Sequence, residues 1–226
     1  MKIDYITGTN TATTKWNSLR MAGGLATGVI FVLFLIGLVG TVISGLTPIP
    51  ASSWLSSLQN NWLVVLFKLN IGMESVGPDS LNVLNPVDIV IMALFGVLFF
   101  SLLATLSRTS RIWSAVATSL PVLGMVVFLI TQTAGRSGLL IGGLIYSIIM
   151  LRSDEFTKLT AYTGIFASAL LFFAGDIGTA LFSASYLIAI SIAIGYVIWM
   201  AWFLLTGLRL IRLGRVESLT TTRTAE

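Results

Sequence analysis

Long apolar runs separated by short polar breaks organise this chain of 226 residues. Apolar runs of about 18 residues or more can cross a bilayer as helices. Barrel strands would show a short alternating pattern instead, and continuous apolar runs such as residues 30–36 do not alternate. The pattern therefore predicts an all-α fold, a polytopic transmembrane helix bundle. We expect six spans, at about residues 21–46, 86–107, 112–130, 138–151, 159–174 and 177–208.

Proline and capping residues support three of these boundaries. The sequence Thr47-Pro48-Ile49-Pro50 ends the first span, because proline has no N–H to donate and disfavours a helical predecessor. The second span has a clear start: Asn85 suits the N-cap, Pro86 the first helical position and Asp88 the first turn. In the turn before the fifth span, Ser153 is the expected cap.

Small residues predict where helices approach one another closely. Gly24 and Gly28 form one small-xxx-small pair, in the first span, and Gly138 and Gly142 form another, in the fourth. Pro121 lies inside the third span and predicts a kink. These pairs suit packing either within the chain or between copies of it.

The segment of residues 47–85 is predicted to be an outer loop that begins with an interfacial helix. Tryptophan and leucine recur at helical spacing over residues 52–69, with polar residues between them, which is typical of a helix lying at the headgroup level. Residues 62–69 are apolar apart from Lys68 but too short to cross, so a re-entrant dip is the alternative. At the other end of the chain, Trp199 and Trp202 are expected to be interface anchors of the last span.

The distribution of basic residues predicts the orientation. Cytoplasmic loops of membrane proteins are enriched in Lys and Arg. If six spans begin with the amino terminus inside, only Lys68 and Arg136 of the 13 basic residues fall outside. We therefore expect a multi-pass protein of the cell membrane with both termini cytoplasmic: a tail of residues 1–20, a membrane domain of residues 21–208 and a basic tail of residues 209–226.

Composition agrees with this class and excludes several kinds of chemistry. The chain is 56% hydrophobic and 10% charged, far less charged than a soluble domain, and its mean hydropathy is +0.96. It contains no His and no Cys, which removes imidazole and thiolate metal sites, disulfides and Cys or His catalysis. We expect no cofactor and no metal. The net charge of +4 reflects basic cytoplasmic turns and indicates no nucleic-acid partner.

The threading brings polar residues to the outer ends of four spans. Asp88, Gln132, Arg136 and Asp176 are expected there, at the ends of spans 2, 3, 4 and 6. One hypothesis is an outward polar pocket in which Arg136 binds an anionic group or exchanges carboxylate partners. The alternative is structural: Asp88 and Asp176 stabilise helix starts, and Arg136 extends to the interface. At lipid depth the expected polar groups are hydroxyls, which argues against a proton-coupled pump.

Three short stretches resemble an uncharacterised six-span family of bacterial and archaeal membrane proteins. They are Leu19-Arg20-Met21-Ala22-Gly23-Gly24, the segment from Asn85-Pro86-Val87-Asp88 through Arg111-Ile112-Trp113, and Thr133-Ala134-Gly135-Arg136-Ser137. The similarity covers most of the chain from Arg20 to about Asp176. It implies six spans and supplies no activity, ligand or catalytic residue.

Three functions are compatible with the sequence. The first is a non-enzymatic transporter-like, channel-like or scaffold subunit, with membrane lipid and copies of the same chain as candidate partners. The second is an intramembrane enzyme acting on lipid, although no motif joins the available serines and carboxylates into a catalytic group, so no catalytic residue is assigned. The third is a sensor or partner-binding subunit that uses the helix of residues 52–69.

Overall fold

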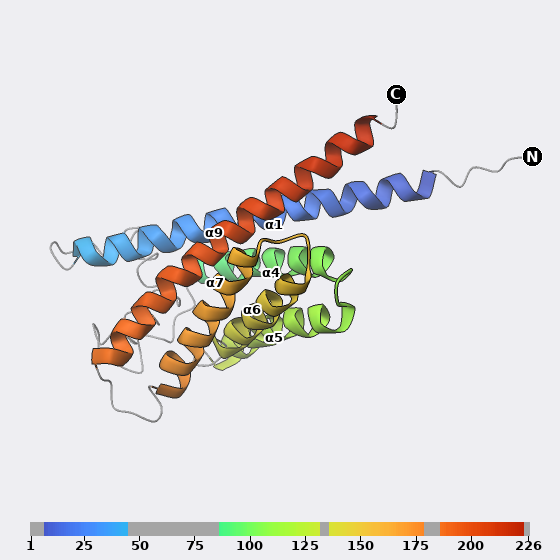
Figure 1. Ribbon diagram of the computed structural model, residues 1–226. Helices are drawn as coiled ribbons and strands as arrows, with labels where there is room; N and C mark the ends of the chain where they lie inside the picture. The colour runs from blue at the N-terminus through green and yellow to red at the C-terminus, as the bar shows by residue number, and fades with distance from the viewer. Residues whose placement is uncertain (1–6, 45–85, 132–135, 179–185, 224–226) are drawn as a thin grey trace, which may run out of the picture.

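The computed structural model describes residues 7–44, 86–131, 136–178 and 186–223 (Figure 1). Within these ranges every regular element is helical, which confirms the all-α prediction. The elements are α1 (Thr7–Ser44), α4 (Pro86–Leu106), α5 (Arg111–Thr131), α6 (Arg136–Arg152), α7 (Lys158–Leu170), the π-helix η2 (Leu171–Gly178) and α9 (Tyr186–Arg223).

Five helical stretches are long and apolar enough to cross a membrane, judged by length and composition. They are Trp16–Gly37, Pro86–Leu106, Arg111–Leu129, Lys158–Gly175 and Ile190–Arg215. The stretch Ser137–Arg152 is also apolar but shorter. These helices suggest a membrane protein, and the all-helical architecture is consistent with a transmembrane bundle.

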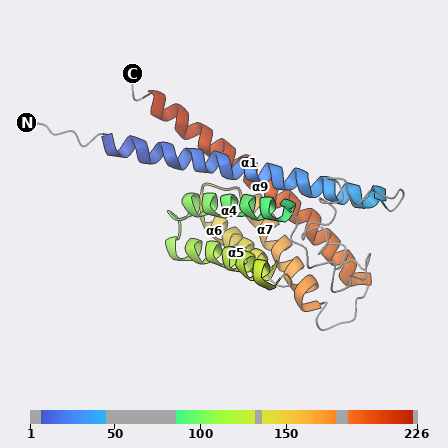
Figure 2. The same cartoon turned by 180° about the vertical axis from the view of Figure 1, so that it is seen from behind.

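The helices run alternately in opposite directions and pack mainly against their neighbours in the chain. The exception is α1, which lies against both α4 and α9 (Figures 1 and 2). On the far side of the bundle α5 packs on α6, α6 on α7, and α7 on α9. The beginning of α1 and the end of α9 extend past the other helices on the same side (Figure 1).

Glycines allow the closest of these contacts. A Cβ at Gly24 would lie 2.7 Å from the carbonyl oxygen of Gly207, so the backbones of α1 and α9 nearly touch. On α6, a Cβ at Gly138 would lie 2.6 Å from the Leu120 carbonyl oxygen, and one at Gly142 would lie 2.8 Å from that of Ala117. The predicted packing role of Gly24 and the α6 pair is therefore confirmed. Gly28 differs, since open space surrounds its Cβ position.

Stacked aromatic rings fill the interior between α1, α4, α6 and α9. The ring of Phe95 lies 5.6 Å from that of Phe203 and 6.3 Å from that of Trp199, measured between centroids. Trp199 and Trp202 are 2% and 0% exposed. The prediction that these tryptophans anchor the interface is therefore wrong: Trp199 packs on Phe95 of α4, Trp202 lies near Gly143 of α6 and Gly164 of α7, and both indole rings are core residues.

Several boundaries differ from those expected. Helix α1 begins at Thr7, well before the first expected span. Asp176 lies inside η2, which continues directly from α7, and does not precede a helix start. The N-cap of α7 is Thr157, whose side chain accepts from the Thr160 amide, and not the expected Ser153, whose hydroxyl accepts from the Glu155 amide inside the turn. The predicted interfacial helix of residues 52–69, with its re-entrant alternative at 62–69, lies outside the described residues.

The close contact between α5 and α6 predicts a pair of unequal glycine substitutions. Gly142→Ala should lower the stability of the detergent-solubilised protein by about 1–3 kcal/mol, because the new methyl group meets the Pro121 ring and the Ala117 carbonyl. Gly28→Ala, also in the middle of a helix, should leave the melting temperature unchanged or slightly raised. Equal melting temperatures for the two variants would contradict this account of the packing.

Candidate functional site at the basic end of the bundle

Basic residues from separate parts of the chain gather at one end of the bundle. The Nε of Arg20 on α1 donates to Thr105 Oγ1, near the end of α4, at 3.3 Å. The α4–α5 turn and the end of α6 line a common cavity. Arg209 of α9 donates to the Glu155 carbonyl in the α6–α7 turn. We call this region the basic end. Its residues are Arg20, Arg108, Arg111, Arg152, Lys158, Arg209, Arg212 and Arg215.

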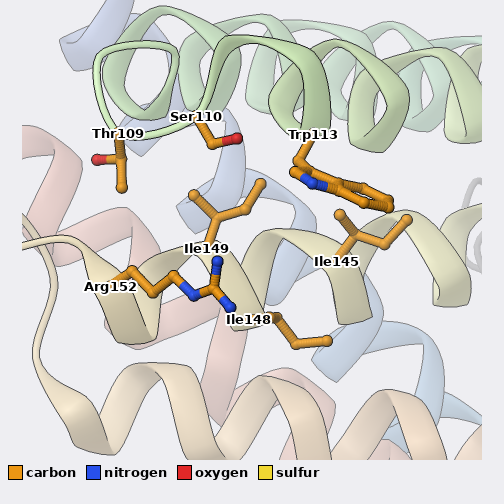
Figure 3. A pocket seen from close by; sticks show the side chains of 7 residues that line it. All are labelled: Thr109, Ser110, Trp113, Ile145, Ile148, Ile149 and Arg152. Carbon is orange, nitrogen blue, oxygen red and sulfur yellow. The ribbon is translucent and has the colours of Figure 1, made fainter.

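The cavity of the basic end has a volume of about 490 Å³ and lies between the first turn of α5 and the last turns of α6 (Figure 3). We call it the α5–α6 cavity. It exists because α5 and α6 are antiparallel, so the start of one faces the end of the other. Its lining residues are Thr109, Ser110, Trp113, Ile145, Ile148, Ile149 and Arg152.

The lining of the α5–α6 cavity changes from polar to apolar along the helices. Figure 3 shows Thr109 and Arg152 toward one side and Trp113 and Ile145 toward the other. Seven residues separate Ile145 from Arg152 on α6, which at the helical rise is about 10 Å. The cavity therefore offers a cation and two hydroxyls at one end and an isoleucine and tryptophan surface at the other.

Arg152 differs from other basic residues around it. Lys158 donates from Nζ to the Leu151 carbonyl at the end of α6, and Arg209 holds the Glu155 carbonyl. Both cations thus stabilise the α6–α7 turn, where Ser153 Oγ also accepts from the Glu155 amide at 3.1 Å. Within the described ranges, by contrast, no hydrogen bond or ion pair engages the guanidinium of the exposed Arg152.

Arg20 is a residue that the sequence did not single out. It was expected in a polar tail, but it lies inside the apolar helical stretch Trp16–Gly37 and is only 1% exposed. It is held where α1 meets α4, one turn before a contact in which the Cβ position of Gly23 overlaps the Ser101 side chain. The position of the arginine about one turn before the pair Gly23-Gly24 was the available signal, since glycines mark where another helix comes close.

The buried hydroxyls bond mainly to backbone carbonyls. Thr27, Thr105, Thr118 and Ser147 each donate to the carbonyl four residues earlier, at 2.6–2.9 Å. The hydroxyl of Tyr146 contacts Thr118 Oγ1 and lies 3.2 Å from the Phe99 carbonyl and 3.1 Å from the Ser114 carbonyl. It thereby joins α4, α5 and α6. These groups satisfy one another and hold helices together, as is usual for hydroxyls in membrane helices.

The predicted outer cluster is described only in part. Asp88 lies in the first turn of α4, as expected, and is 3% exposed. Arg136 begins α6 and Asp176 lies in η2, but their side chains are outside the description, and so is the whole of Gln132. The cluster therefore stays a prediction. Among the described residues no group of three or more acidic residues could hold a metal ion.

No family model, no curated protein and no solved structure matches the chain. The resemblance to a six-span family therefore stays a prediction, and function has to be inferred from the residues and their geometry.

The contact between Arg209 and the Glu155 carbonyl predicts that α9 stabilises the α6–α7 turn. In Arg209→Gln this charge-assisted hydrogen bond is lost, and the amides of residues 153–157 should exchange their hydrogens about tenfold faster, equivalent to about 1.4 kcal/mol. Arg212→Gln makes the same charge change on an exposed side chain of α9 and serves as the control. An equal change in both variants would assign the effect to net charge and not to the contact.

Proposed function

We propose that this protein is a non-enzymatic integral membrane protein with six spans, whose termini and basic end face the cytoplasm and which acts as a membrane scaffold. The span that adds to the five longer helices is α6, the fourth along the chain. Its 17 residues extend about 25 Å, slightly less than the hydrocarbon thickness of about 30 Å, a difference that local thinning and flanking residues accommodate. The five longer apolar helices supply the remaining spans.

The orientation is supported by the gathering of charge. In an alternating bundle, the start of α1, the α4–α5 and α6–α7 turns and the end of α9 share one end, and basic residues occur in every one of these segments. Asp154 and Glu155 are the acidic residues of the described turns there, and basic residues outnumber them. By the positive-inside bias, this end belongs in the cytoplasm.

The filled interior is the observation that carries the scaffold proposal. Phe34 stacks on Tyr196, Phe99 stacks on Tyr146, and Trp202 packs on Phe203, so that rings from four helices occupy the centre. A transporter or channel needs a hydrated path with polar groups at mid-depth. The described centre is filled by rings, and hydroxyls such as those of Thr118 and Tyr146 already bond to carbonyls there, which favours a packed framework over a path for a substrate.

An intramembrane enzyme has less support. A serine nucleophile needs a base within hydrogen-bond reach. In the described ranges the buried hydroxyls of Ser101, Ser114 and Ser168 have no hydrogen-bond partner, and that of Ser147 bonds to its own helix. The sensor alternative depends on residues 52–69, outside the described residues. Assembly from several copies of the chain is compatible with a scaffold and stays a prediction.

The absence of cysteine from the chain allows a clean topology test. Single cysteines introduced as Thr109→Cys and Asp154→Cys should be protected from a membrane-impermeant maleimide in intact cells and react once the membrane is permeabilised. Ser80→Cys, in the expected outer loop, should react in intact cells and serves as the matched control. The measurement is the mass shift of the purified protein.

Reaction of the Thr109→Cys and Asp154→Cys variants in intact cells would contradict the cytoplasmic orientation. If these two variants reacted from opposite sides, the number of spans between them would be odd, and the assignment of α5 and α6 as a pair of spans would be wrong.

A further inference from the structure

We propose that the α5–α6 cavity binds one anionic glycerophospholipid from the leaflet that the basic end faces. The phosphate would lie against Arg152, Thr109 and Ser110, and the upper acyl chains against the isoleucines and Trp113. This inference rests on the proposed function, because it requires the basic end to lie at a membrane surface.

The polarity of the cavity matches the polarity of such a lipid. A glycerophospholipid passes from a charged phosphate to hydrocarbon within the width of the membrane interface. The α6 side of the cavity makes the same change over about 10 Å, from Arg152 to Ile145. Trp113, 57% exposed at the first turn of α5, has the position in which tryptophan is enriched in membrane proteins, at the headgroup level.

The charges are complementary to a phosphate. Arginine binds phosphate through paired hydrogen bonds, and the hydroxyls of Thr109 and Ser110 can donate to further oxygens. Within the described ranges no hydrogen bond or ion pair commits the Arg152 guanidinium. Arg108 on the α4–α5 turn and Arg111 at the start of α5 are exposed, flank the lining residues Thr109 and Ser110 in the sequence, and add to the local positive potential.

The size favours a lipid over a small anion. About 490 Å³ lies within the range of ligand pockets and far exceeds what an inorganic phosphate fills. A small anion would also leave Ile145, Ile148 and Ile149 uncovered. Ile148 is 43% exposed, so the rest of the acyl chains can leave the cavity along α6 into the surrounding lipid.

Native mass spectrometry of the full-length protein in detergent tests this proposal. The protein is titrated with dioleoylphosphatidylglycerol and, separately, with dioleoylphosphatidylcholine. We expect one phosphatidylglycerol to bind about tenfold more tightly than phosphatidylcholine, the magnitude of one hydrogen-bonded charge interaction. Arg152→Gln should remove this preference, and Arg152→Lys should retain part of it, since lysine keeps the charge without the paired geometry.

Controls separate the cavity from general positive charge and from misfolding. Arg212→Gln removes an exposed arginine away from the cavity and should keep the full preference. Each variant must keep the melting temperature of the unmodified protein, which excludes misfolding as the cause. Thr109→Val is a second change in the cavity lining, and it does not alter the charge. It should weaken the binding of both lipids several-fold, because both carry the phosphate that Thr109 contacts, and leave the preference for phosphatidylglycerol in place.

Three results would overturn the proposal. Two are a preference for phosphatidylglycerol that is unchanged in Arg152→Gln and a preference that Arg212→Gln loses to the same extent. The third is displacement of the lipid by equimolar glycerol 3-phosphate, which would reveal an anion site without an acyl component. Micelles have no sides, so binding is measured independently of orientation. If the unmodified protein shows no preference for phosphatidylglycerol while Thr109→Cys is protected in intact cells, the lipid site is refuted and the proposed orientation is not. If the protein prefers phosphatidylglycerol but Thr109→Cys reacts in intact cells, the proposed orientation is refuted and the lipid site is not.

Discussion

Close approach of helix backbones at glycines is the constraint on which the rest of this structure depends. Between apolar helices in lipid there is little hydrophobic force, so association relies on dispersion contacts, which fall away steeply with distance. Gly24 against the Gly207 carbonyl brings α1 onto α9, and Gly142 against Pro121 brings α6 onto α5. The first contact fixes the two long helices that hold the chain ends. The second sets the spacing between the helices that form the α5–α6 cavity.

The polar features follow from these contacts. Where α1 lies close to α4, at Gly23, the guanidinium of Arg20 reaches Thr105 and is buried, although the sequence places it in a polar tail. Where α9 passes the beginning of α7, Arg209 reaches the α6–α7 turn. Neither contact is local in sequence. The basic end is thus assembled by tertiary packing. Three of its cations, Arg20, Lys158 and Arg209, hold parts of the bundle together, whereas Arg152 lines a cavity.

Most of the helical framework could be predicted from the sequence, because the length of an apolar run, a proline and a glycine each act on the local structure. Pro86 starts α4 as expected, and Gly138 and Gly142 make the contacts that their spacing predicted. What could not be predicted is which face of each helix turns inward. A helix that is apolar all round carries no such signal, so Trp199 and Trp202 read as interface anchors although they are buried. The α5–α6 cavity was missed for a related reason: Thr109 and Arg152 are distant in sequence and meet only because α5 and α6 are antiparallel. Of the predicted outer cluster, only the Asp88 side chain is described.

The central claim is that a packed helical framework presents Arg152 to a lipid phosphate at a cytoplasmic basic end. An electron cryo-microscopy structure of the protein in nanodiscs containing phosphatidylglycerol tests it most directly. The account predicts an elongated lipid density in the α5–α6 cavity, with its phosphate against Arg152 and its chains along Ile145 and Ile148. An empty or collapsed cavity, with Arg152 paired to a carboxylate such as Asp154, would contradict the account.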